Sequence, residues 1–287
     1  MKLSILIVNY NTESFIQKLL TSLQKQTLNT ADFEIIIVNN VQNHRLNEML
    51  ETGDFNRYFH LSVYDSGDNL GFGKAMNLAA RHATGEHLLL MNPDILMLQD
   101  NYLEQLLHHA GQHLNYGVIS TQILDDNQHD VSTYYSYEFN NTLGYDGEIC
   151  WFQGSLLLIR GEVYKLLDGF DPDFFMYCED VDLCLRIKKL GLPLIKIDDL
   201  KVYHFGGASE PNHDYHYYHR HITSQFLFAK KHYDPESYQQ LVKELHQKSQ
   251  KRLMVYRMSA KLFKKHMRHL IKWQVMYDVT KGLNLGN

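Results

Sequence analysis

Short, almost wholly apolar runs alternate with amphipathic segments along the first third of the chain. Runs of this kind are typical of strands buried on both faces, and the segments between them have helical spacing. The predicted strands are residues 2–8, 33–38, 61–64 and 86–91. Strands joined by helices at this spacing indicate βαβ units, and therefore an α/β fold with a parallel sheet.

Polar, asparagine-rich segments follow all four predicted strands, at residues 9–11, 39–40, 69–73 and 92–94. In open α/β sheets, ligands bind in the crevice outside the carboxyl ends of the strands. The convergence of these segments therefore predicts a ligand-binding edge.

The next part of the chain has a less regular pattern. Residues 117–123 and 151–160 are predicted strands, and the polar, tyrosine-rich stretch 125–148 between them is a substrate-side loop or a hairpin. Residues 180–190 form the clearest predicted helix, because apolar side chains recur on one face and Gly191 follows.

Charge divides the chain into two regions. Residues 1–211 carry 14 Lys/Arg and 28 Asp/Glu, whereas residues 212–287 carry 14 Lys/Arg and 5 Asp/Glu. We therefore expect an acidic domain over 1–211 and a basic helical extension over 212–287.

Composition places the chain among ordinary globular proteins, with 287 residues, 44% hydrophobic and 21% charged. The longest apolar runs are strand-sized, which predicts no transmembrane helix. No signal-peptide cleavage site follows the first apolar run, and the three cysteines lack CxxC spacing. These features favour a cytoplasmic protein.

Three segments are candidates for chemistry. Asp94, after the fourth strand, is either part of an Asn-Pro turn or a ligand for a hard cation, and His204 is either a filler or a second ligand. Glu179 and Asp180 open the strongest helix, where they are either N-terminal acids or proton acceptors.

Several common enzyme motifs are missing. The Gly71-Phe72-Gly73 turn lacks the third glycine of a dinucleotide fingerprint, and GxSxG, Walker A and HExxH patterns are absent. This excludes the commonest dehydrogenase, hydrolase and NTPase classes.

Taken together, the motifs resemble those of family 2 glycosyltransferases of the GT-A fold, in the rhamnosyltransferase-like branch that builds bacterial surface polysaccharides. The resemblance covers about residues 2–232. It is carried by 7–11, 69–73 with Asn77, 92–94, Gly154-Ser155, 169–171, 174–182, and His204 with Gly206, Gly207 and Ser209.

The resemblance implies a Rossmann-like nucleotide-binding half, with a mixed central sheet flanked by helices, and an inverting transfer reaction. It makes Asp180 the general base, with Glu179 beside it. Asp94 and His204 become the ligands of Mn²⁺ or Mg²⁺. The implied donor-binding residues are Val8, Asn9, Tyr10, Asn11, Asn39, Asn69, Gly71, Phe72, Lys74, Asn77, Asn92 and Arg220. The implied acceptor or sugar side consists of Trp151, Gly154 and Ser155.

Three positions depart from the family pattern. Asn92 replaces the first acid of the DxD motif, as is usual in this branch. Asn39 stands where an acid generally helps to hold the nucleoside, and Ala75 where glycine is common.

The expected reaction moves L-rhamnose from dTDP-rhamnose to a saccharide or lipid-linked saccharide. The alternatives are a UDP-hexose donor (galactose or N-acetylglucosamine) and a non-catalytic subunit that binds nucleotide sugars.

The basic extension predicts an amphipathic helix within 243–273, because Tyr256, Ala260, Phe263, Met267 and Leu270 recur at helical spacing beside Lys and Arg. It would contact the inner surface of the cell membrane or pack on the acidic body or a second subunit, as in a homodimer. Nucleic-acid binding is not expected.

Overall fold

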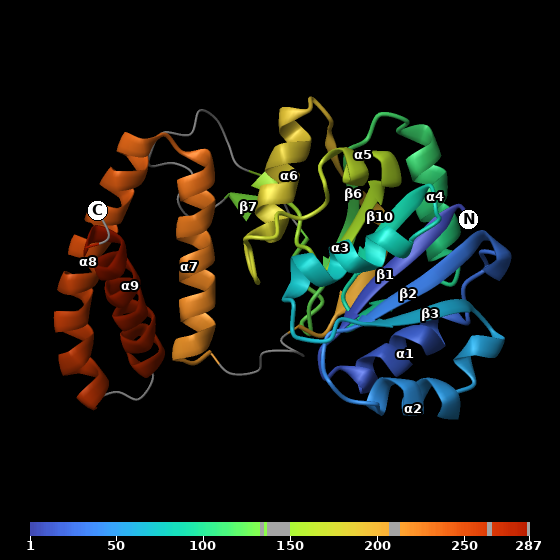
Figure 1. Cartoon of the computed structure of the whole chain (residues 1–287), viewed down its shortest axis with the longest axis horizontal. Helices are drawn as coiled ribbons and strands as arrows, with labels where there is room; N and C mark the ends of the chain where they lie inside the picture. Colours follow the sequence, from blue (N-terminus) through green and yellow to red (C-terminus); the bar gives the residue numbers. More distant parts are fainter. Residues whose placement is uncertain (133–134, 137–149, 207–212, 263–265, 286–287) are drawn as a thin grey trace. The chain divides into compact units, whose positions relative to one another are not determined.

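The computed structural model describes residues 1–132, 135–136, 150–206, 213–262 and 266–285 (Figure 1). These residues include an eight-stranded sheet with the order β3-β2-β1-β4-β9-β6-β10-β5. Its strands are β1 (Leu3–Asn9), β2 (Phe33–Asn39), β3 (His60–Asp65), β4 (His87–Met91), β5 (Ile95–Met97), β6 (Val118–Leu124), β9 (Leu156–Arg160) and β10 (Leu194–His204). A separate pair joins β7 (Tyr135–Ser136) to β8 (Cys150–Trp151).

The sheet is mixed, as expected. Strand β1 lies parallel to β2 and β4, and β2 is parallel to β3. Strand β9 runs antiparallel to both β4 and β6, and β5 runs antiparallel to β10. The four parallel strands therefore end at one edge, where the asparagine-rich segments follow them.

Helices cover both faces of the sheet. Helices α1 (Glu13–Leu23), α2 (Arg45–Thr52) and α4 (Tyr102–Gln112) pack on one face. Helices α3 (Phe72–His82), α5 (Gly161–Leu166) and α6 (Glu179–Lys189) pack on the other. Alternation along β1 supplies both cores, because Ile5 and Ile7 face the first group of helices and Leu6 faces the second.

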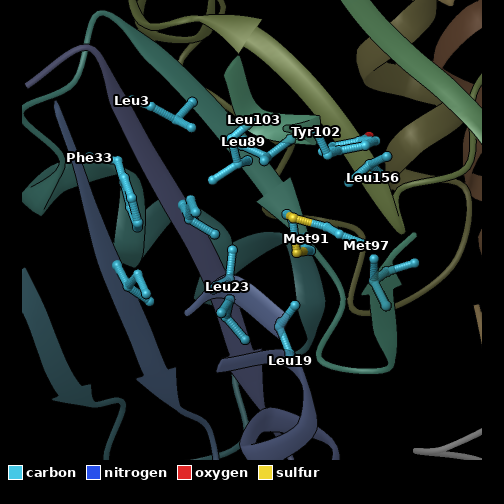
Figure 2. Close-up of a cluster of buried hydrophobic side chains, with 14 of the residues drawn as sticks. Leu3, Leu19, Leu23, Phe33, Leu89, Met91, Met97, Tyr102, Leu103 and Leu156 are labelled. Carbon is cyan, nitrogen blue, oxygen red and sulfur yellow. The ribbon is translucent and has the colours of Figure 1, made fainter. Parts of the chain in front are cut away.

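Figure 2 shows the core on the side of α1 and α4. Leu19 and Leu23 of α1 lie among side chains from β1, β2 and β4, and Leu103 comes from α4. Apolar burial on both faces explains why the parallel strands are almost continuous apolar runs.

Most predicted elements are confirmed to within one or two residues, including the four early strands and α6. The prediction of a single strand over residues 151–160 is wrong. Cys150–Trp151 and Leu156–Arg160 are separate strands, because the chain turns at Gly154 and Ser155. The stretch 125–148 lies largely outside the described residues.

A second compact unit contains the C-terminal helices α7 (Tyr215–His232), α8 (Pro235–Leu262) and α9 (Met267–Leu285). It also includes Met176–Cys178, whereas Met1–Tyr135 and Cys150–Phe175 belong to the first unit. The expected boundary at 211/212 lies outside the described residues.

The basic amphipathic segment is not one helix, which corrects the expectation for 243–273. Helix α8 ends at Leu262 and α9 begins at Met267, and the two pack against each other in opposite directions. The His246 ring stacks on Tyr277 with centroids 5.1 Å apart, and the Tyr256 ring stacks on His269 at 5.2 Å. Tyr256 and Met267 therefore lie on different helices. None of the described helices is long and apolar enough to cross a bilayer.

Candidate functional site

A chain of side-chain hydrogen bonds crosses the carboxyl ends of β1, β2 and β3. Asn9 and Asn39 are almost fully buried, and the Asn9 amide nitrogen donates to the Asn39 oxygen at 2.9 Å. The Asn39 amide nitrogen donates in turn to a carboxylate oxygen of Asp65 at 2.9 Å. Asn39 stands where the family pattern has an acid. The neighbouring Asp65 supplies a carboxylate at this edge of the sheet.

Asp65 was missed by the sequence analysis. It directly follows the predicted strand 61–64, so the same rule that selected Asn39 would have selected it.

A second pair of asparagines shapes the loop that enters α3. Asn40 donates to the side-chain oxygen of Asn69 at 3.0 Å and accepts the Leu70 N–H at 2.9 Å. The Asn69 oxygen also accepts the N–H of Gly71, whose φ is +78°. A Cβ at Gly71 would lie 2.0 Å from the carbonyl oxygen of Phe175, so glycine is needed there.

The remaining residues expected at the nucleotide differ in their exposure. Val8 is buried in the core, whereas Tyr10 is 38% exposed and Lys74 is exposed on the first turn of α3. Asn11 has a left-handed backbone with φ of +55°.

Asn77 braces a loop in this structure. Its amide nitrogen donates to the Phe170 carbonyl at 2.7 Å, and its oxygen accepts the Phe170 N–H and the Tyr164 hydroxyl. Both ends of the Asn77 amide are therefore used within the protein.

Asp94 and His204 lie together, as predicted. Asp94 follows β4, and His204 ends β10, whose residues pair with β5. The Nε2 atom of His204 is 3.3 Å from Oδ1 of Asp94, and Asp94 is only 4% exposed. A carboxylate oxygen and an imidazole nitrogen at this separation fit the donor set of Mn²⁺ or Mg²⁺.

Among the described residues, no group of three or more His, Cys, Asp or Glu side chains is placed to hold a metal. A cation held by Asp94 and His204 would therefore take its other ligands from a phosphate-bearing substrate or water, as Mg²⁺ usually does.

Asp180 lies at the first turn of α6, and one carboxylate oxygen accepts the Gly154 N–H at 2.9 Å. The other oxygen accepts the Val181 N–H at 2.9 Å. Burial raises the pKa of Asp180, while these two N–H groups favour its charged form. A Cβ at Gly154 would lie 3.4 Å from both Asp180 and the Phe72 ring, so these three residues are in close contact.

Glu179 is more deeply buried than Asp180, with 6% exposure, and its Oε2 atom has no hydrogen-bond partner in the structure. Burial, and secondarily the adjacent charge of Asp180, raise the pKa of Glu179 to about 8. At neutral pH, which lies below this value, Glu179 therefore carries a proton.

The backbone before this pair is strained. Tyr177 and Cys178 have φ values of +71° and +64°, in the left-handed region. Such conformations of non-glycine residues cost about 1–3 kcal/mol each and persist only where the surroundings fix them.

Short contacts connect these groups within the first unit. The Asn92 N–H donates to the Ser155 carbonyl at 2.9 Å, which joins the turn carrying Asp94 to Gly154 and Asp180. Ser155 is 4% exposed and its hydroxyl has no hydrogen-bond partner in the structure. Trp151 is half-buried in β8. Arg220 lies on α7 in the second unit, so its role stays a prediction.

The family model for glycosyl transferase family 2 matches residues 4–182. The chain belongs to this family. Rhamnosyltransferase WbbL of Escherichia coli (strain K12) is 27% identical over 230 residues, which cover 70% of this chain and 82% of WbbL. The resemblance to the rhamnosyltransferase-like branch is therefore confirmed.

Two solved structures show the same fold. Mannosyltransferase PcManGT from Pyrobaculum calidifontis, in complex with GDP-Man and Mn²⁺, gives a TM-score of 0.62 at 15% identity, covering 98% of this chain and 86% of that one. Staphylococcus aureus TarS 1-349, in complex with UDP-GlcNAc, gives 0.58 at 17% identity, covering 100% and 93%. These likenesses confirm the GT-A fold.

Glu179→Gln should change how stability depends on pH. Because the pKa of Glu179 is about 8 in the folded protein and its ordinary value is 4.5, the folded state binds the proton more tightly than the unfolded chain does. The stability contributed by that proton is present below pH 4.5 and is lost as pH rises toward 8. We expect the melting temperature of Glu179→Gln relative to wild type to rise across this window.

Glu162→Gln, at an exposed acid of α5, is the matched control and should show no such trend. A melting-temperature difference for Glu179→Gln that stays flat with pH would show that Glu179 is ionised in the folded protein.

Proposed function

We propose that this chain is an inverting, metal-dependent glycosyltransferase that moves L-rhamnose from dTDP-rhamnose to a saccharide or lipid-linked saccharide in cell-surface polysaccharide synthesis. The observation that carries the proposal is the linkage of Asp180, through Gly154 and Ser155, to the turn bearing Asp94. The name of WbbL, a rhamnosyltransferase, supports the choice of sugar.

Asp180 is the general base of this reaction. Its carboxylate takes the proton of the acceptor hydroxyl as that oxygen attacks the anomeric carbon, and the electron pair of the breaking bond leaves with the nucleoside diphosphate. One displacement inverts the anomeric configuration. Burial helps, because a raised pKa brings Asp180 closer to the operating pH. Glu179, whose pKa of about 8 keeps it protonated at neutral pH, adds no negative charge beside Asp180.

Asp94 and His204 would hold Mn²⁺ or Mg²⁺. A divalent cation there supplies positive charge that offsets the charge developing on the departing diphosphate. The protein's own contribution is orientation, since the Phe205 N–H donates to the Asp94 carbonyl at 3.1 Å and fixes the turn against β10.

The donor would lie along the carboxyl ends of the strands. The hydrogen-bonded chain of Asn9, Asn39 and Asp65 lies on the nucleoside side, and Lys74 and Arg220 are proposed diphosphate contacts. The unpartnered hydroxyl of Ser155 is proposed to bond to the transferred sugar, because a buried hydroxyl without a partner is costly.

A UDP-hexose donor is the second candidate, favoured by the likeness to TarS in complex with UDP-GlcNAc. A non-catalytic subunit that binds nucleotide sugars is the third, and measured sugar transfer or donor hydrolysis excludes it.

The C-terminal helices are proposed to contact the inner face of the cell membrane, with the enzyme on the cytoplasmic side. Met254, Val255 and Met258 of α8 are 67%, 53% and 69% exposed. Exposed Lys251 and Arg257 flank them, a combination suited to an anionic lipid surface. A homodimer contact is the alternative use of this surface.

Asp180→Asn should lower turnover by about 10²–10⁴-fold, because the amide cannot accept the proton. The measurement is nucleoside diphosphate release from dTDP-rhamnose and UDP-hexoses, with water as acceptor where no other is known. Nucleotide affinity should stay nearly unchanged. Asp173→Asn, at an exposed acid of the preceding loop, should keep wild-type turnover. If Asp180→Asn retains most of its turnover, Asp180 is not the base.

A thermal-shift panel of UDP, dTDP and GDP, with and without Mn²⁺ or Mg²⁺, tests the donor and the metal site. A nucleotide at 100 times its dissociation constant adds about 2.7 kcal/mol of stability. We expect dTDP to stabilise the protein most, only with metal, and Asp94→Ala to remove that effect. Stabilisation by UDP alone would favour the second candidate, and metal-independent stabilisation would contradict the role of Asp94.

Sedimentation with lipid vesicles tests the membrane contact. Wild type should sediment with phosphatidylcholine vesicles that contain phosphatidylglycerol, and less with phosphatidylcholine alone or at high salt. Met254→Asp/Met258→Asp should lose this binding, whereas Leu114→Asp, at a residue 74% exposed in the first unit, should retain it. Equal sedimentation of both variants would refute the contact.

A further inference from the structure

We infer that helix α7 positions the general base, and that the positioning residue is Ser224, which holds the strained segment Met176–Cys178 ahead of Asp180. The inference rests on the proposed role of Asp180. It gives the C-terminal helices a part in the reaction beyond any contact with a membrane.

The strained segment needs contacts with other parts of the protein to keep its backbone conformation. Tyr177 and Cys178 are consecutive non-glycine residues with left-handed backbones, and Glu179 and Asp180 follow at once. Neither side chain favours this conformation by itself, because the Cβ atom of an L-residue crowds the backbone there. The surroundings must therefore keep the segment in place.

Ser224 provides a direct contact. Its hydroxyl donates to the Met176 carbonyl at 2.7 Å, and Ser224 is only 7% exposed on the buried face of α7. A hydroxyl in the middle of a helix usually bonds to its own helix or to water. Here it bonds to a segment 48 residues earlier in the chain.

Aromatic side chains of α7 contact the next residue. The ring of Tyr177 lies 5.7 Å from that of Tyr217 and 5.1 Å from that of His221, measured between centroids. Three side chains of one helix therefore contact two successive residues of the strained segment.

The first unit fixes the preceding residue. The Phe175 carbonyl accepts the Phe72 N–H at 3.0 Å, beside Gly71, where a Cβ would collide with that carbonyl. The carbonyls of Phe175 and Met176 are thus held by α3 and α7 respectively. Release of Met176 would let Tyr177 and Cys178 relax to negative φ, which would turn the start of α6 and draw Asp180 away from Gly154.

Hydrogen exchange of the Gly154 backbone N–H tests the inference without any substrate. In Ser224→Ala, we expect exchange at Gly154 to become about tenfold faster, the size of a typical hydrogen-bond contribution. Ser224→Thr, which keeps the hydroxyl, and Thr223→Ala, at the exposed neighbour, should exchange like wild type.

A double variant separates this role from simple packing of α7. Glycine adopts positive φ without steric cost, so Cys178→Gly in the Ser224→Ala background should restore slow exchange at Gly154. Should Ser224→Ala not fold, Tyr177→Leu removes the ring contacts instead and should also speed exchange. Unchanged exchange in the folded variants, or no rescue by Cys178→Gly, overturns the inference.

Turnover gives the second measurement. Ser224→Ala should lower kcat for nucleoside diphosphate release by about tenfold at unchanged donor KM, and Cys178→Gly should recover it. If Asp180→Asn is inactive but Ser224→Ala has wild-type kcat and exchange, only this inference fails. If Asp180→Asn is active, the proposed base fails, and the exchange measurement still decides whether Ser224 holds the contact between Gly154 and Asp180.

Discussion

A partly buried carboxylate must be stabilised where it lies, and for Asp180 the backbone N–H of Gly154 does this. The bond joins the first turn of α6 to the turn between β8 and β9. Because the Ser155 carbonyl in the same turn accepts the Asn92 N–H, the acid pair and the turn carrying Asp94 are fixed relative to each other. Two adjacent residues, Gly154 and Ser155, thus set the spacing between Asp180 and the paired Asp94 and His204.

The apolar pattern was sufficient to predict the parallel strands, because burial on both faces leaves little choice of residues. It was insufficient for β5, which is only three residues long, and for the break at Gly154, where apolar residues continue on both sides of a turn. The place of β9 between β4 and β6 depends on long-range pairing that no local pattern carries.

The residues of the candidate site show the same division. The positions of Asn9, Asp94, Asp180 and His204 at the ends of their elements were predictable from the sequence pattern and the family motifs. The left-handed backbone of Tyr177 and Cys178 was not, because neither residue favours it and the segment contacts a helix that is distant in the sequence. In the basic extension, one apolar spacing continues across the break between α8 and α9, so the periodicity predicted a single helix where there are two. Part of its charge is used internally, where Lys248 and Arg252 lie over the Trp273 ring.

The sheet order has a consequence for synthesis on the ribosome. Strand β4, His87–Met91, pairs with β1 on one side, but its other neighbour is β9, Leu156–Arg160. The apolar edge of β4 therefore stays unpaired until residue 160 has left the ribosome, after β6 has already been made. An unpaired apolar edge is a template for wrong pairing. The nascent chain therefore passes through an aggregation-prone intermediate. This intermediate persists until β9 inserts between β4 and β6.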